Sequence, residues 1–251
     1  MRGYLVLDTE TVPDRDLYQP PETATGVDKP FPPPYAHRLI VIGVLWLDAD
    51  YRWKRLGVVG EGKDEAGMLA DFATFVERER PHLVTYNGRG FDLPVILLRA
   101  LRHGVPLRFY YQDRDYRFRY SQEGHLDLCD FLSEHGAARS LSLDAAARLI
   151  GLPGKVGVDG SQVEGLHASG QIDAIRRYCL SDVLQTAFLF LRFRLLEGVI
   201  DPPTYTRLAA ALLDAAISDG RIAEVCERVD RERLLLTLPP TPQLPLALPT
   251  T

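Results

Sequence analysis

The 251-residue chain has few cysteines, no long apolar run and no excess of basic residues. Its three cysteines, Cys129, Cys179 and Cys226, are far apart and show neither zinc-site spacing nor a disulfide framework. This usage is typical of a reducing cytosol, so we expect a cytoplasmic protein. No stretch reaches the roughly 18–20 apolar residues that span a bilayer, and acids interrupt the first apolar run. We therefore expect neither a membrane span nor a signal peptide.

The formal net charge is −5, from 29 Lys and Arg against 34 Asp and Glu. Such a balance argues against a protein that coats a nucleic-acid duplex, because those proteins carry a basic footprint. It does not argue against an enzyme that holds a few nucleotides in a cleft, where clustered acids can bind cations that offset the substrate's charge. The length suits one α/β domain with additions, or two small domains.

Short apolar runs alternate with patterns of helical period along the chain. We predict strands over 4–7, 39–47, 53–59 and 82–86, and helices over 64–80, 93–103, 127–135, 140–150, 172–196 and 203–219. The segment 13–36 holds seven prolines and reads as a long irregular loop, 109–120 as an extended segment, and 151–170 as a Gly-rich one. The pattern predicts a mixed sheet of five or six strands flanked by helices.

Two acids close the first apolar run. Residues i and i+2 of a strand point to the same side, so Asp8 and Glu10 project together while Thr9 faces away. Taken alone, this pair is more typical of a solvated strand end than of a site. An isolated ionised acid in an apolar surrounding is costly unless it is paired or binds a metal.

A second acid follows the strand at 82–86. The sequence Asn87-Gly88-Arg89-Gly90 supplies a tight turn, and Asp92 then stands where a helix N-cap belongs, with Pro94 in the first turn. By itself, Asp92 is well explained as a capping residue.

A third acid lies on the long helix predicted over 172–196. Tyr178 and Asp182 are four residues apart and share one helix face, and chance produces many such pairs. Together, the three segments are much more specific, because their order can bring four carboxylates to one point. Like charges so close resist ionising together unless cations relieve the repulsion. Hard oxygen ligands suit Mg²⁺ or Mn²⁺, and two such ions can activate a water and stabilise a leaving phosphodiester oxygen.

The blocks D-T-E, N-G-x-x-F-D-x-P and Y-x-x-x-D resemble the three motifs of the DEDD 3′→5′ exonucleases. More narrowly, they resemble the DEDDy branch, in the group akin to the proofreading exonuclease domain of family B DNA polymerases. The likeness runs over about 4–196 and includes the blocks at 125–128 and 151–155. The sister branch has His five residues before the last Asp, where this chain has Arg177, so Tyr178 favours the Tyr branch.

The resemblance implies an RNase H-like fold and two-metal hydrolysis with two divalent cations, Mg²⁺ or Mn²⁺. It makes Asp8, Glu10, Asp92 and Asp182 the metal ligands, with Asp8 bridging both ions, and it has Tyr178 orient the attacking water. A phenol with a pKa near 10 is a poor base at neutral pH, so we expect Tyr178 mainly to position that water. We predict an exonuclease domain over 1–198, a helical C-terminal extension over 199–238 and a proline-rich, disordered tail over 239–251.

Three further residues are candidates for substrate binding, each with a simpler explanation. Thr11 either touches the terminal nucleotide or ends the strand; Asn87 either bonds substrate or forms the turn; Phe91 either stacks on a base or packs under the turn. The basic and aromatic residues of 114–120 fit a strand-tracking groove or a solvated hairpin. Asp127 lies near the site or caps a helix, and Lys155 reaches a phosphate or is simply solvated.

We expect a 3′→5′ exonuclease that acts on single-stranded or frayed DNA ends, in a repair or proofreading setting, with no membrane partner. Proofreading would require a polymerase, or another repair protein, as a separate chain. An exoribonuclease with the same chemistry is the alternative, because contacts to the 2′-OH separate RNA from DNA and no residue decides them. A catalytically idle nucleic-acid-binding or scaffold protein would have lost some of the acids, and all four are present.

Overall fold

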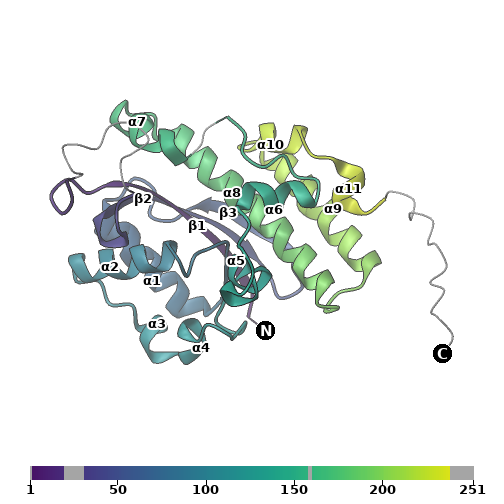
Figure 1. Cartoon of the computed structure of the whole chain (residues 1–251), viewed down its shortest axis with the longest axis horizontal. Coiled ribbons are helices and arrows are strands. Elements are labelled where there is room, and N and C mark those ends of the chain that lie inside the picture. The colour runs from purple at the N-terminus through teal and green to yellow at the C-terminus, as the bar shows by residue number, and fades with distance from the viewer. Residues whose placement is uncertain (1, 20–30, 158–159, 238–251) are drawn as a thin grey trace.

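The computed structural model describes residues 2–19, 31–157 and 160–237. Its centre is a five-stranded sheet with the order β3-β2-β1-β4-β5. The sheet lies between α1 and α2 on one side and α8 on the other (Figure 1). The central strand β1 pairs antiparallel with β2 and parallel with β4, while β3 is antiparallel to β2 and β5 parallel to β4. This mixed sheet confirms the predicted architecture. The strands are Tyr4–Pro13 (β1), His37–Leu47 (β2), Trp53–Val58 (β3), His82–Thr85 (β4) and His125–Asp127 (β5).

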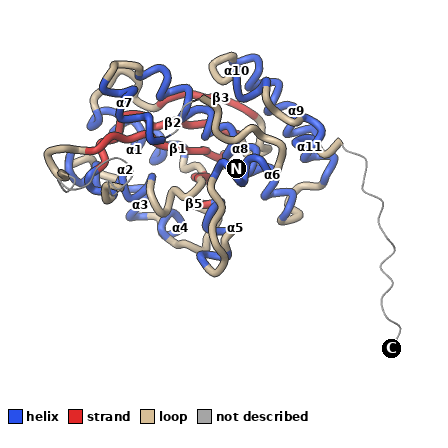
Figure 2. Tube along the Cα trace, turned by 45° about the horizontal axis from the view of Figure 1, so that its top comes forward, coloured by secondary structure: helices blue, strands red, loops and turns tan. Residues whose placement is uncertain are grey.

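Helices cover both faces of the sheet, which explains the continuous apolar run of β1 (Figure 2). Leu5 and Leu7 pack with α1 (Glu65–Glu79) and α2 (Asp92–His103) on one face. Val6 packs with α8 (Ile172–Leu196) on the other. Because side chains of a strand alternate, Asp8 and Glu10 lie on the α8 face.

The flanking helices begin and end at residues suited to those positions. Asp64 caps α1, and its side chain accepts a hydrogen bond of 2.8 Å from the amide of Gly67. Gly104 ends α2 in the left-handed conformation, which glycine adopts without steric cost. α8 has the bounds predicted from its helical period, and its central residues are buried on nearly every side because the sheet and further helices surround it.

The C-terminal extension consists of α9 (Pro202–Asp219), α10 (Ala223–Glu227) and α11 (Arg231–Leu235). Tyr205 and Leu212 of α9 belong to the same hydrophobic core as Leu45 of the sheet and the residues of α8. Arg221 also donates a 2.8 Å hydrogen bond to the carbonyl of Leu56. The extension is thus helical and joins the main core, while the boundary at 198 remains a prediction.

The prediction of an extended segment over 109–120 is wrong. Two short helices, α3 (Arg108–Gln112) and α4 (Arg114–Arg117), fold there. They bury the rings of Phe109 and Tyr116 in the α1/α2 side of the core, and the Tyr116 hydroxyl donates a 2.7 Å hydrogen bond to the Pro81 carbonyl. Burial of these two rings outweighs the local tendency toward strand.

The helix predicted over 127–135 begins one residue later, because 125–127 completes the sheet as β5. The first part of the proline-rich segment continues β1 to Pro13, and residues 20–30 and the tail 239–251 lie outside the described residues. Within the described ranges, no helix is long and apolar enough to cross a membrane. The remaining short helices are η2 (Pro34–Ala36), α5 (Leu128–Leu132), η3 (Glu134–Gly136), α6 (Leu143–Leu149), η4 (Gly160–Gln162) and α7 (Val163–Ala168).

A buried ion network joins the end of β1 to the two helices beneath it. Arg99 of α2 is 2% exposed and bonds Asp14 at 2.7 Å and Glu65 at 2.6 and 2.7 Å. Glu65 also accepts a 2.7 Å hydrogen bond from the amide of Leu39. The charges are paired and hydrogen-bonded, which is what permits them in the interior. The network holds the end of β1, and therefore the acids upstream of it, against α1 and α2.

Candidate active site

Two of the predicted acids lie together on β1. The carboxylates of Asp8 and Glu10 and the thiol of Cys179 each offer an atom within 4.8 Å of the others. Glu10 is 8% exposed, and Asp8 is partly exposed. The pairing of β1 with β2 shifts register between Glu10 and Thr11, so a bulge directly follows the acid pair. Bulges of this kind redirect side chains beside active sites.

Helix α8 approaches the strand closely because a glycine lies beneath it. Gly43 of β2 pairs with Asp8, and a Cβ added there would lie 2.6 Å from the sulfur of Cys179. The Cys179 thiol in turn lies 3.4 Å from Oδ2 of Asp8 and 3.5 Å from its carbonyl oxygen. The thiol is a weak donor to both oxygens. Neither Gly43 nor Cys179 has a local sequence pattern that marks it as part of the site.

The acid of the second motif stands at the start of α2. Asp92 is the first residue of the helix, after Phe91, so the simpler explanation of Asp92 as the N-cap residue does not hold. It is 4% exposed, and its Oδ1 accepts a 2.6 Å hydrogen bond from the hydroxyl of Thr9. Thr9 faces away from Asp8 and Glu10, as predicted, but it is more than a spacer between them. It joins the strand to the acid on the helix.

The turn between β4 and α2 is held by an acid from a third strand. Asn87 has a positive φ of 64°, and the amides of Asn87 and Arg89 donate 2.8 Å hydrogen bonds to the two carboxylate oxygens of Asp127. Asp127 also caps α5 through the amides of Cys129 and Asp130. Its predicted capping role is confirmed, and its second role fixes the turn that leads into Asp92.

The third motif faces the same acids from α8. The charges of Asp8, Glu10 and Asp182 all raise the pKa of Tyr178, after burial, which is the largest cause. Tyr178 directly precedes Cys179, whose thiol contacts the Asp8 carboxylate, so the third motif and the first belong to one neighbourhood. Burial raises the pKa of Asp182 to about 7, while the nearby Tyr178 hydroxyl and the charge of Lys155 act in the opposite direction.

The four acids resist ionisation together. Burial and the charges of Asp92, Glu10 and Asp182 hold the pKa of Asp8 well above its usual range. Burial and the charges of Asp182 and Asp92 do the same for Glu10. Burial raises the pKa of Asp92 to about 6, despite the hydrogen bond from Thr9. A divalent cation would relieve this repulsion, and the oxygen donors suit Mg²⁺ or Mn²⁺.

A cavity of about 740 Å³ opens beside Glu10 and Thr11. Phe91 and Lys155 also line it, so Thr11 and Phe91, both predicted as substrate contacts, face one space. Asn87, the third predicted contact, lines a separate hollow of about 650 Å³ with Arg89, Arg119 and Arg139. Sequence reasoning missed several further residues of the first cavity. Among them are Phe31 and His37, which belong to the proline-rich segment and to the start of β2.

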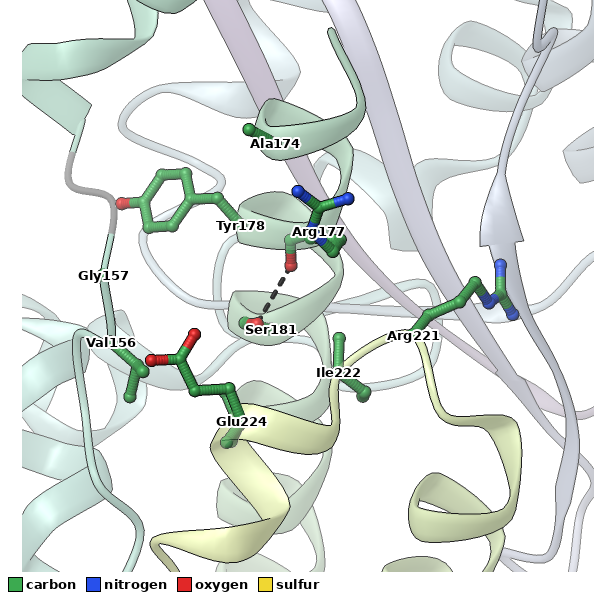
Figure 3. A pocket seen from close by; sticks show the side chains of 10 residues that line it. Val156, Gly157, Ala174, Arg177, Tyr178, Ser181, Arg221, Ile222 and Glu224 are labelled. Atoms are coloured by element: carbon green, nitrogen blue, oxygen red, sulfur yellow. Dashed lines mark hydrogen bonds between the residues drawn. The ribbon is translucent and has the colours of Figure 1, made fainter. Parts of the chain in front are cut away.

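A smaller pocket of about 150 Å³ is lined by Tyr178 and lies between α8, the segment around Val156 and the C-terminal extension (Figure 3). Glu224 of α10 points into this space toward Val156, and Arg177 and Ser181 line it from α8. The extension therefore forms one wall of the surroundings of Tyr178.

The mixed sheet in this strand order, flanked by helices, is an RNase H-like α/β fold, and acids from β1, α2 and α8 gather beside the middle of its central strand. Residues 29–227 match the family of predicted 3′-5′ exonucleases related to the exonuclease domain of PolB, and the chain belongs to this family. The resemblance drawn from the motifs is confirmed. Asp92, Tyr178 and Asp182 lie inside the matched range, and Asp8 and Glu10 precede it.

Two DNA polymerases illustrate the relationship. The catalytic subunit of DNA polymerase epsilon from Schizosaccharomyces pombe is 25% identical over 135 residues, which are 52% of this chain and 6% of that protein. The family B DNA polymerase from the hyperthermophilic archaeon Pyrobaculum calidifontis has a similar fold, with a TM-score of 0.55 and 21% identity. That similarity covers 94% of this chain and 29% of the polymerase. The chain thus spans a small part of each.

Proposed function

We propose that the chain is a metal-dependent 3′→5′ exonuclease. It hydrolyses phosphodiester bonds at the 3′ ends of single-stranded or frayed DNA and releases nucleoside 5′-monophosphates. One observation carries the proposal: the carboxylates of Asp8 and Glu10 lie together in the middle of β1, and the charges of Asp92 and Asp182 act on both, in a chain of this family. Because buried acids so close are costly, their retention together is best explained by bound cations.

Four residues would hold the ions, namely Asp8, Glu10, Asp92 and Asp182. When bound, two Mg²⁺ or Mn²⁺ ions supply an activated water and charge stabilisation at the leaving oxygen. Thr9 fixes the carboxylate of Asp92, and Cys179 contacts that of Asp8, so both ligands are oriented by neighbours. Such supporting contacts orient metal ligands and tune the site.

Tyr178 acts as a hydrogen-bond donor that orients the attacking water. Burial and three nearby acids raise its pKa above the ordinary value for tyrosine, so the phenol keeps its proton at neutral pH. A protonated phenol is no general base, and the chain's own contribution at this position is geometric. Lys155 lines the cavity together with Glu10, and its positive charge faces the phosphate of the terminal nucleotide.

Thr11 accepts a hydrogen bond from a sugar hydroxyl of the terminal nucleotide. The ring of His37 decides this polarity. Its Nε2 lies 2.9 Å from the Pro32 carbonyl, which only accepts, so Nε2 carries the proton and Nδ1 is free to accept. The Thr11 hydroxyl, 2.8 Å away, donates to Nδ1 and keeps its lone pairs for the substrate. Burial lowers the pKa of His37, which keeps the ring neutral.

A degradation assay on 5′-labelled single-stranded DNA and RNA, with Mg²⁺, Mn²⁺ or EDTA, tests the proposal. We expect stepwise shortening of DNA from the 3′ end with either cation, and none with EDTA or in Asp8→Ala. Asp71→Ala, which removes an exposed acid of α1, is the matched control and should retain activity. Activity that survives EDTA or Asp8→Ala would overturn the two-metal mechanism. Faster degradation of RNA would favour the exoribonuclease alternative.

Replacing Tyr178 by Phe tests the role of the hydroxyl separately. We expect turnover to fall about 10- to 100-fold, the usual effect of losing a supporting contact at a metal site, with little change in substrate affinity. Unchanged turnover would remove Tyr178 from the mechanism while leaving the metal ligands in place. A polymerase or repair protein as a separate partner chain belongs to the proposal and requires a binding experiment of its own.

A further inference from the structure

The apolar ring of Phe31 is exposed to solvent in the cavity beside the acid cluster. It is 75% exposed, more than most large apolar side chains of the described residues, and it lines the cavity that also contains Glu10 and Thr11. An exposed ring in a cavity loses the stabilisation that burial of an aromatic side chain gives. Its position therefore calls for an occupant that is flat and apolar on at least one face.

The ring of Phe31 is backed by two others. Its centroid lies 4.9 Å from that of His37 and 5.7 Å from that of Phe91, and the His37 and Phe91 rings meet edge to face at 4.9 Å. His37 is fixed by its hydrogen bonds to Pro32 and Thr11. The three rings form an aromatic wall, which brings together the proline-rich segment, the start of β2 and the residue before α2. Such pairs prefer tilted or edge-to-face packing at these separations.

The wall stands at a fixed place relative to the catalytic acids. Thr11 follows Glu10 by one residue, and its hydroxyl touches His37, so one hydrogen bond separates the wall from the acid strand. On another part of the cavity lining, Lys155 supplies positive charge. The cavity thus has an aromatic side, which suits the base of a nucleotide, and a positively charged side, which suits its phosphate.

We infer that Phe31 stacks on the base of the 3′-terminal nucleotide and that the aromatic wall of Phe31, His37 and Phe91 forms the base-binding side of the cavity. The inference rests on the proposed function, because it places that nucleotide beside Glu10. Stacking on an aromatic ring accepts every base, since each has a π-face. It predicts binding without strict sequence preference, with purines held more tightly than pyrimidines because they stack over a larger area.

The test measures the affinity of the protein for 5′-labelled single strands by fluorescence anisotropy. Ca²⁺ takes the place of Mg²⁺, because it accepts oxygen ligands in a looser geometry. One strand ends in adenosine, a second carries an abasic nucleotide at its 3′ end, and a third carries it at its 5′ end. We expect Phe31→Ala to weaken binding of the first and third strands about 5- to 140-fold, the range for one base–aromatic stack. The 3′-abasic strand should bind both proteins equally.

Two variants complete the design. Tyr35→Ala removes another exposed aromatic ring of the same segment, one that does not line the cavity, and should bind as the unchanged protein does. Phe31→Trp should restore discrimination against the 3′-abasic strand. Equal affinities of Phe31→Ala and the unchanged protein for all strands would overturn the inference, as would an equal loss on all three. Binding needs no cleavage, so strands that bind in this pattern but are never degraded would count against the proposed function alone.

Discussion

The hydroxyl of Thr9 on β1 donates a 2.6 Å hydrogen bond to the carboxylate of Asp92 on α2. The residue between the two acids of the first motif therefore contacts the acid of the second. One strand positions acids on both sides of itself: Asp8 and Glu10 toward α8, and Asp92 through Thr9 at the start of α2.

Thr9→Val keeps the shape of the side chain and removes this hydrogen bond. A supporting contact of this kind is worth about 10- to 100-fold in metal affinity or activity, so we expect losses of that size. A calorimetric titration with Mn²⁺ measures the affinity for the metal independently of turnover. Thr74→Val, on the exposed side of α1, removes a hydroxyl that donates to the carbonyl of Ala70 and is the control. If Thr9→Val and Thr74→Val bind Mn²⁺ alike, Thr9 does not support Asp92.

Gly43→Ala tests the close approach of α8 to the acid strand. The new methyl group would meet the sulfur of Cys179 at 2.6 Å, so α8 has to shift. Overpacking of this kind costs about 1–3 kcal/mol, and the shift also moves Tyr178 and Asp182. Thermal unfolding and the exonuclease assay should both report the change.

Gly57→Ala on β3 is the matched control, because a Cβ there meets nothing within 4 Å. The double variant Gly43→Ala/Cys179→Ala removes the clashing sulfur and should recover much of the lost stability. A double variant no more stable than Gly43→Ala would show that the sulfur is not what limits the approach.

The acid cluster makes the stability of the metal-free protein depend on pH. Its acids have raised pKa values in the folded state, about 6 for Asp92 and about 7 for Asp182. An unfolded Asp titrates near about 3.9. Between these values the folded protein binds protons that the unfolded chain has released, so stability falls as pH rises from about 4 to about 7.

Thermal unfolding with EDTA and with Mn²⁺ at pH 5 and pH 7.5 checks this linkage. We expect Mn²⁺ to raise the melting temperature more at pH 7.5, where the acids repel one another, than at pH 5, where protons relieve the repulsion. Asp182→Asn removes one charge and should reduce the difference. An equal stabilisation by Mn²⁺ at both pH values would contradict a cation bound by these acids.

Arg99→Met tests the buried network at the end of β1. It leaves Asp14 and Glu65 as buried charges without their main partner, and breaking such a pair costs about 3–5 kcal/mol. For a chain of this size that loss lowers the melting temperature by about 6–20 °C. Arg148→Met, which breaks an exposed pair with Asp144, should lower it by no more than a few degrees. Similar shifts in the two variants would show that the buried network contributes little.

Much of the sheet, and the elements that carry the acids, could be predicted from local patterns. Three of these patterns depend only on residues that are close in the sequence, so they can be recognised without the fold. They are the apolar run of β1, the helical period of 172–196 and the turn residues 87–90. The prediction of an extended conformation for 109–120 failed because the rings of this segment are buried by contacts with α1 and the Pro81 carbonyl. Both are distant in sequence. β5 was missed since three residues form a strand only when a neighbouring strand is present.

By itself, the sequence determined which residue types are available for chemistry and where each stands on its strand or helix. Only the tertiary structure decided how they are supported. Thr9 reaches Asp92 across 83 positions, Cys179 reaches Asp8 across 171, and Asp127 holds a turn some 40 positions before it. These contacts depend on how the helices pack on the sheet, and packing is a property of the whole core. A local pattern can therefore name the acids, while their orientation and their cavity arise only when the chain is folded.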